Sequence, residues 1–307
     1  MIRIGCCSFI FGGMGLEDSL RLCSLLGFRS VDVSAADIGP KAHVDQQEAA
    51  AKPEEQARRV RALADKYELE LEEVFLCPVF VEGKRVEVSH PDAAVRASLL
   101  DRFRRLIVFA ETAGFRSLMA VPGTPQKNLS PEQAWANACG TLREMVKIAA
   151  DRGVRLNVEP HTGSLIEQPQ AALRMAEETP GLTFTLDYAH FAARAIPQEQ
   201  VYPLHRYTRH MHARQAKAGA GGCAVTEGTI RFEAILAQLR AADWDGVIAM
   251  EYFGGVGAKP WEEHAVIQNA ALAHQLASLS PRPGLSPGCD AGKADGGAGK
   301  RGPCARP

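Results

Sequence analysis

Four side chains in the sequence could together bind one divalent cation. Each ends a short run in which apolar and polar residues alternate, and they are Glu159, Asp187, His212 and Glu251. Three carboxylates and one imidazole form an oxygen-rich ligand set, which suits Mn²⁺ or Mg²⁺, and also accepts Co²⁺ or Zn²⁺. Three negative charges gathered in one place repel one another unless a cation neutralises them. The four residues therefore predict a site for one divalent metal ion, with Mn²⁺ as the first choice.

The alternation that precedes these residues predicts β-strands with one apolar face. In 182–187, three apolar side chains point to one side and Asp187 points to the other. The same pattern recurs in the segments 31–34, 156–161 and 247–252. The segment 207–212 fits less well, because Arg209 falls on its apolar face. Each strand would pack its apolar face against helices and turn a polar face, ending in an acid, towards the interior.

Eight strand candidates alternate with eight helix candidates along the chain. The strands begin near Ile2, Arg29, Glu70, Arg116, Val154, Leu182, Arg206 and Val247. The helix-like segments lie near 17–26, 52–67, 92–113, 130–151, 168–178, 198–205, 231–242 and 261–279. Strict alternation favours a parallel sheet, and eight such strands close a barrel. The sequence thus predicts an α/β protein, a (β/α)8 TIM barrel, in which the ligands meet at the C-terminal ends of the strands.

The barrel is expected to span residues 1–280. The segment 281–307 is dominated by Gly, Pro and Ala and contains a single Leu. Such a segment buries too little apolar surface to offset its ordering entropy, so we expect a disordered Gly/Pro-rich tail. An insert at 79–88, with a turn at 82–84, predicts a β-hairpin after the third strand.

Composition excludes several classes of protein. The 307 residues carry 35 Lys and Arg against 36 Asp and Glu, and this net charge of -1 gives no electrostatic reason to bind nucleic acid or an anionic membrane. No stretch approaches about 18 uninterrupted apolar residues, and the first residues lack the features of a secretory signal. The eight cysteines form no CxxC pair, and most lie in apolar segments. We therefore expect a cytoplasmic protein with reduced thiols.

Four short motifs surround the candidate ligands. They are Asn157-Val158-Glu159-Pro160-His161, Leu186-Asp187-Tyr188-Ala189-His190, His210-Met211-His212 and Ala249-Met250-Glu251-Tyr252. With these motifs the chain resembles the xylose isomerase-like TIM-barrel superfamily, and within it the sugar phosphate isomerase/epimerase family most closely. The segment 227–232 and the Trp244-Asp245-Gly246 sequence also resemble the last strand–helix unit of that family. The resemblance covers about residues 1–280 and is strongest between 154 and 253.

The resemblance implies that Glu159, Asp187, His212 and Glu251 bind the metal, and that Glu159 and Glu251 also act as the catalytic acid and base. A hydroxy-carbonyl compound can chelate a metal ion, which then stabilises the enediolate formed when the adjacent carbon loses a proton. Two carboxylates on opposite sides of that plane can remove the proton from one face and return one to the other. The expected function is therefore that of a divalent-metal-dependent isomerase or epimerase of a keto sugar or a related hydroxy-carbonyl compound.

Three further residues are candidate substrate ligands. The resemblance implies that His190 holds a substrate oxygen, whereas a loop histidine without a role is the alternative. Arg214 has the same strand parity as His212 and could bind a hydroxyl or phosphate group. His161 follows Glu159 and could support the site from behind. We expect a small carbohydrate as the substrate, and the resemblance is compatible with a homo-oligomer.

Two departures from the family pattern narrow these expectations. His212 is followed by Ala213-Arg214-Gln215, where many relatives carry a Lys-Asp pair or a nearby acid. The nuclease branch needs such an acid, so DNA repair is disfavoured, and the sugar specificity stays open.

A metal-dependent lyase or dehydratase, of the kind that acts on inososes or 3-keto sugars, is the main alternative to an isomerase or epimerase. A non-catalytic barrel that binds metal or sugar is the third possibility.

Overall fold

The computed structural model of the protein describes residues 2–11, 13–35, 43–76, 79–81, 84–252 and 261–279. Eight parallel strands close a barrel in the order β1-β10-β9-β8-β7-β6-β3-β2. They are β1 (Arg3–Cys7), β2 (Ser30–Ser34), β3 (Glu70–Leu76), β6 (Ser117–Ala120), β7 (Arg155–Val158), β8 (Thr183–Asp187), β9 (Thr208–Ala213) and β10 (Val247–Met250). The predicted (β/α)8 barrel is therefore confirmed.

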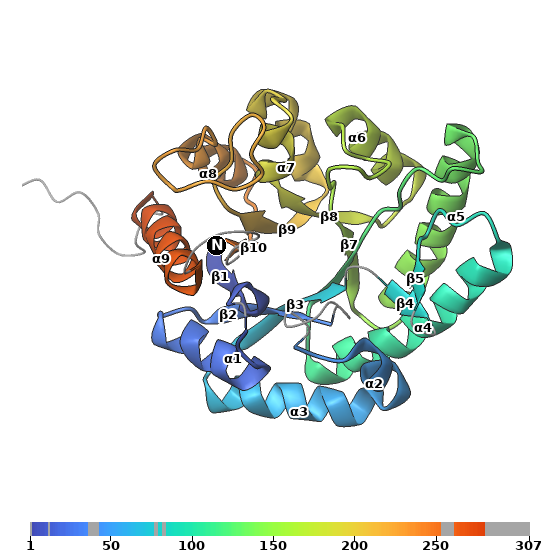
Figure 1. Ribbon diagram of the computed structural model, residues 1–307, viewed down its shortest axis with the longest axis horizontal. Helices are drawn as coiled ribbons and strands as arrows, with labels where there is room; N and C mark the ends of the chain where they lie inside the picture. Colours follow the sequence, from blue (N-terminus) through green and yellow to red (C-terminus); the bar gives the residue numbers. More distant parts are fainter. Residues whose placement is uncertain are drawn as a thin grey trace, which may run out of the picture.

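The helices form a ring around the strands (Figure 1). They are α1 (Leu16–Leu25), α2 (Gln46–Ala51), α3 (Pro53–Lys66), α4 (Ala93–Ala113), α5 (Pro131–Ala150), α6 (Pro169–Glu178), α7 (Tyr188–Ala193), α8 (Phe232–Ala241) and α9 (Trp261–Leu279). The predicted hairpin is present as the antiparallel strands β4 (Val79–Val81) and β5 (Lys84–Val86). The predicted tail, 281–307, lies outside the described residues. Within the described part of the chain, no helix is long and apolar enough to cross a membrane.

One predicted helix is wrong. The segment 198–205 forms two 3-10 turns, Gln198–Gln200 and Tyr202–Arg206, in place of an α-helix. Pro203 lies inside this segment and lacks the backbone N–H that a continuous α-helix needs there. The α-helix that follows β8 is instead α7, which begins directly after Asp187.

Local sequence signals fix where the elements begin and end. Ser130 starts α5 with a capping box, because its hydroxyl accepts from the Gln133 backbone N–H at 3.2 Å while the Gln133 side chain accepts from the Ser130 N–H at 3.0 Å. Gly114 ends α4 with a positive φ of 85°, a conformation that favours glycine. The capping box and the glycine thus fix the residue at which α5 begins and the residue at which α4 ends.

The inner and outer faces of the strands have opposite chemistry. Outward residues such as Leu118, Phe184 and Leu186 are fully buried between the strands and the helices. Inward residues such as Asn157 and Thr185 are equally buried but polar. The strand parity read from the sequence is thus confirmed. Arg209 does not break it, because this side chain is exposed at the start of β9 and donates to the Arg206 and Thr208 carbonyls at 3.1 and 2.9 Å.

The capping box of α5 is expected to contribute about 1 kcal/mol to the free energy of unfolding. Replacement of Ser130 by Ala removes the hydroxyl that satisfies the Gln133 N–H, so the stability should fall by about this amount in urea denaturation. Ser98 lies inside α4, where its hydroxyl bonds to the Val95 carbonyl at 2.7 Å. Ser98→Ala is therefore the matched control and should change the stability by less than about 0.5 kcal/mol. Equal effects of the two variants would contradict the role of the cap.

Candidate active site

The four predicted metal ligands meet at one mouth of the barrel. Glu159 directly follows β7, Asp187 ends β8, His212 lies near the end of β9, and Glu251 directly follows β10. One oxygen from each of the three carboxylates lies within 4.8 Å of the others. The Nδ1 atom of His212 is 3.2 Å from Glu159 Oε1 and 3.3 Å from Glu251 Oε1. Because all four side chains are buried, the negative charges are concentrated in a region of low dielectric.

This donor set fits a divalent ion. Its oxygen and imidazole donors are the types that Mn²⁺ and related ions take. Asp187 Oδ1 accepts from the Ala189 N–H at 2.8 Å, whereas Asp187 Oδ2 has no hydrogen-bond partner in the described part of the chain and lies 2.7 Å from Arg214 Nη2 as an ion pair. A buried carboxylate oxygen without a hydrogen bond is costly unless a cation lies next to it.

Arg214 supplies positive charge to the same cluster. Its Nη2 atom lies 2.7 Å from Asp187 Oδ2, as an ion pair outside hydrogen-bonding geometry, and its Nη1 atom pairs with Glu251 Oε2. Its Nε–H donates to the Gly221 carbonyl at 3.1 Å. The structure thus places Arg214 among the predicted metal ligands, with 9% of its surface exposed.

The two predicted substrate histidines, His190 and His161, lie next to Glu159, Asp187 and Arg214. His190 Nε2 is 3.6 Å from Glu159 Oε2, 3.7 Å from Asp187 Oδ2 and 3.4 Å from Arg214 Nη2. The ring of His161 lies against that of His190, with 4.2 Å between the centroids. The structure therefore brings all seven predicted site residues together.

Comparisons with known proteins identify the family of this barrel. A profile of the xylose isomerase-like TIM barrel family matches residues 20–274. The chain belongs to that family. A search of curated protein sequences gave no significant match.

Solved structures of this family's fold resemble the chain over nearly their whole length. A D-tagatose 3-epimerase-like protein is 19% identical, with a TM-score of 0.69 and coverage of 90% of this chain and 97% of that one. D-psicose 3-epimerase from Clostridium cellulolyticum H10 is 16% identical, with a TM-score of 0.70 and coverage of 90% and 98%. The probable 3-DHS dehydratase of petrobactin synthesis from Bacillus anthracis is 15% identical, with a TM-score of 0.64 and coverage of 90% and 98%. At these identities the likeness shows the fold.

Two carboxylates of this xylose isomerase-like site have opposite pKa shifts. Burial raises the pKa of Glu251 to about 7, against the opposing effects of the His212 and Arg214 charges. Burial acts in the same direction on Glu159, but hydrogen bonds from His190 and His212 hold the pKa of Glu159 well below its usual range. A pair of groups whose environments separate their pKa values is suited to act as acid and base.

Asp32 on β2 lies deep in the xylose isomerase-like barrel, next to His212. The Asp32 carboxylate is fully buried, and its Oδ2 atom is 2.8 Å from His210 Nε2 and 3.6 Å from His212 Nε2. Cys7 was missed as a neighbour of the site, although its thiol, His212 and Glu251 form a compact group. The inward parity of β1 is the signal that could have found Cys7.

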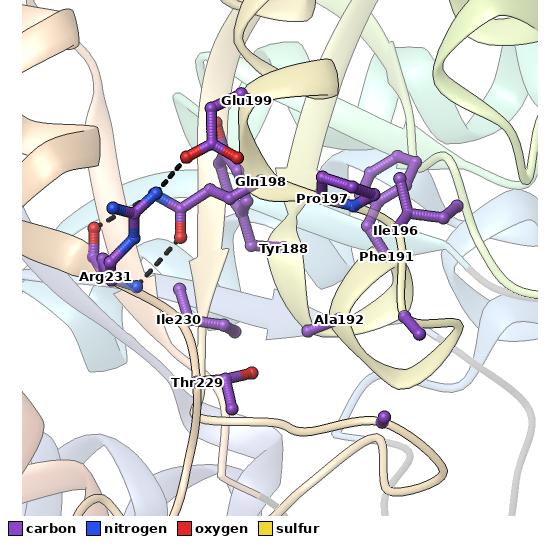
Figure 2. Close-up of a pocket in the computed structure, with 12 residues that line it drawn as sticks. Tyr188, Phe191, Ala192, Ile196, Pro197, Gln198, Glu199, Thr229, Ile230 and Arg231 are labelled. Atoms are coloured by element: carbon purple, nitrogen blue, oxygen red, sulfur yellow. Dashed lines mark hydrogen bonds and ion pairs between the residues drawn. The ribbon is translucent and has the colours of Figure 1, made fainter.

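A separate cavity of about 260 Å³ lies beside the site, against the other face of α7. Figure 2 shows Arg231 beside Gln198 and Glu199, where its backbone N–H donates to the Gln198 amide oxygen at 2.9 Å and its guanidinium pairs with Glu199. None of the predicted site residues lines this cavity, so the chemistry of the family site does not take place there.

In the metal-free protein, Glu251 should lower the free energy of unfolding as the pH rises from about 5 to about 7.5, whereas buried His43 and His205, whose pKa values are lowered to about 4, act in the opposite direction up to about pH 6.5. An unfolded chain releases the Glu251 proton near pH 4.5, whereas the folded state keeps it to about pH 7, so this group destabilises the folded state across this window. His212 acts in the same direction above pH 6.5, because its pKa is raised well above that value in the folded state. The free energy of unfolding in urea with EDTA, measured at pH 5.5 and 7.5, tests this expectation.

Glu251→Gln is the informative variant, because a neutral amide cannot ionise. The change in its free energy of unfolding from pH 5.5 to pH 7.5 should be more positive than that of the unmodified protein, because the loss due to Glu251 is absent. Glu227 is an exposed carboxylate paired with Lys217, and Glu227→Gln should keep the original pH dependence. The interpretation fails if Glu251→Gln shows the same slope as Glu227→Gln.

Proposed function

We propose that this protein is a divalent-metal-dependent isomerase or epimerase of a keto sugar or a related hydroxy-carbonyl compound. The observation that carries the proposal is the convergence of Glu159 Oε1 and Glu251 Oε1 on His212 Nδ1, at 3.2 and 3.3 Å, in a buried cluster that also contains Asp187. The similarity in fold to proteins named as D-tagatose and D-psicose 3-epimerases supports a ketose as the substrate class.

Glu159, Asp187, His212 and Glu251 would hold the ion, and Mn²⁺ is our first choice. The ion supplies a Lewis acid that stabilises negative charge on substrate oxygens and orients the carbonyl and hydroxyl groups. Asp187 would bind the ion and have no part in proton transfer. Its Oδ1 atom accepts from the Ala189 N–H at the start of α7, and this hydrogen bond fixes the carboxylate. Glu159 and Glu251 have a second role in proton transfer.

Glu159 and Glu251 would exchange the proton with the substrate. The Glu159 carboxylate, held ionised by His190 and His212, takes the proton from the carbon next to the carbonyl and leaves an enediolate. Glu251 delivers a proton from its own side. Delivery to the opposite face of the same carbon inverts it, whereas delivery to the neighbouring carbon interconverts ketose and aldose.

The substrate hydroxyl groups would be held by His190 and Arg214. His190 Nε2 and Arg214 Nη2 are 3.4 Å apart and both point towards Asp187, so they converge on one region. His161 packs against His190, and we assign it the role of keeping the His190 ring in place.

We also propose a cytoplasmic location for this chemistry. The free thiols, including those of buried Cys6 and Cys7, support a reducing setting.

A lyase is the second candidate function, and one observation favours it. His190 and His161 place two imidazoles next to Glu159, where one could protonate a leaving hydroxyl group. A protein named as a probable 3-DHS dehydratase also shares the fold. The same enediolate would then lose a β-substituent in place of regaining a proton.

A proton NMR screen in heavy water tests the proposal and separates the two functions. Protein loaded with Mn²⁺ and then freed of excess ion would be mixed with ketoses, ketose phosphates, inososes and 3-keto glycosides. We expect deuterium next to a carbonyl, together with an isomeric sugar. An enone or deoxy-diketone product would assign the lyase. The absence of exchange with every compound, in folded protein shown to hold the ion, would contradict both.

Glu159→Gln and Glu251→Gln should each lower kcat by about 10²–10⁴-fold, because neither amide can accept or deliver the proton. Glu227→Gln, on an exposed loop, is the matched control and should keep kcat within about twofold. Isotope exchange at the substrate carbon is the measurement. If either variant in the site exchanges as fast as Glu227→Gln, the assignment of acid and base is wrong.

A further inference from the structure

A second buried carboxylate lies directly beneath the metal ligands. Asp32 on β2 is fully buried, and it faces His210 and His212 on β9 from across the barrel. Its Oδ2 atom is 2.8 Å from His210 Nε2 and 3.6 Å from His212 Nε2. One carboxylate oxygen therefore faces two imidazole rings from below.

His212 is the residue that needs this carboxylate. Its Nδ1 atom faces Glu159 and Glu251, which makes Nδ1 the nitrogen that would bind the ion. A neutral imidazole with a bare Nδ1 carries its proton on Nε2. Nε2 is buried and has no hydrogen-bond partner within ordinary distance in the described part of the chain. The nearest carboxylate oxygen is that of Asp32, so only a small movement separates Nε2–H from an acceptor.

Asp32 is itself held in place from three sides. Its Oδ1 atom accepts from the Glu73 N–H at 3.2 Å. His210 bonds to Oδ2 at 2.8 Å, and the Cys7 thiol lies 3.6 Å from the same oxygen. A carboxylate fixed to β1, β3 and β9 in this way cannot follow a rotating imidazole. The Asp32 carboxylate can therefore fix the orientation of the His212 ring.

We infer that Asp32 is the positioning residue of the metal centre. Its carboxylate accepts the Nε2–H of His212 and so fixes the ring with Nδ1 towards Glu159 and Glu251. A carboxylate behind a ligand histidine fixes the tautomer and raises the basicity of the nitrogen that binds the ion. This inference rests on the proposed function, because it assigns Asp32 a role toward the same ion. The competing explanation is that Asp32 only neutralises His210 inside the barrel.

Metal affinity separates these two roles. Asp32→Leu should weaken Mn²⁺ binding, measured by calorimetry, by about 10–100-fold. Asp32→Asn keeps a carbonyl acceptor and should restore part of that loss. His210→Gln keeps an N–H donor towards Asp32, so the Mn²⁺ affinity should stay within about threefold. The same variant should lower the thermal stability, because it removes the buried imidazole that pairs with Asp32. Ser117→Ala is the matched control, because it removes a buried hydrogen bond to Glu73 in the same interior and touches neither Asp32 nor His212. Equal Mn²⁺ affinities in the folded Asp32 variants and the control would overturn the inference.

The tautomer of His212 gives a second test that needs no substitution at Asp32. In the ¹⁵N-labelled protein, Nε2 of His212 should carry a proton both without metal and with Zn²⁺, and only Nδ1 should change its chemical shift when Zn²⁺ binds. A proton on Nδ1 with a bare Nε2 would overturn the inference. If the protein binds no divalent ion at all, the proposed function fails, while the metal-free spectrum still decides whether Asp32 orients His212.

Discussion

The constraint on which the structure depends is the burial of three carboxylates within 4.8 Å of one another. Unscreened negative charges at such distances destabilise the folded state strongly. The protein surrounds them with cationic groups: Arg214 pairs with Asp187 and Glu251, and His212 lies between Glu159 and Glu251. These groups do not satisfy the cluster completely, because one oxygen of Asp187 keeps no hydrogen bond in the described residues.

The barrel interior beneath the site is arranged to hold these charges. In a TIM barrel the interior layers usually consist of bulky branched side chains. Here Glu73 accepts three buried hydrogen bonds, with distances of 2.5–2.7 Å, from Ser117, Asn157 and Thr185. A polar layer of this kind is favourable only when each member is satisfied, and it then admits few alternative arrangements. The backbone N–H of Glu73 also donates to Asp32, so this polar layer holds Asp32 in place beneath the candidate metal ligands. The site is thereby preorganised by the strands, while the helices outside contribute the apolar burial.

Strand parity allowed the four ligands to be predicted from the sequence, because a period of two residues is a local property of the chain. Strand parity shows whether a side chain points into or out of the barrel, but not how far along the barrel axis it lies. For this reason the sequence could not show that Asp32 lies next to His210 and His212, or that Arg214 lies among the carboxylates. The helix α7 escaped prediction because six residues are too few to show an apolar period. Likewise, the relation between Cys7 and Glu251 depends on β1 closing against β10, a contact that no short window of sequence contains.

The central claim is that Glu159, Asp187, His212 and Glu251 act together as one divalent-ion site. A titration of the protein with Mn²⁺, followed by the electron paramagnetic resonance signal of the free ion, tests this claim most directly. We predict that each chain removes one Mn²⁺ from solution, and that Asp187→Asn weakens this binding by at least about 100-fold while the protein stays folded. An undiminished signal of free Mn²⁺ with the unmodified protein, or the same binding curve for Asp187→Asn, would contradict the account.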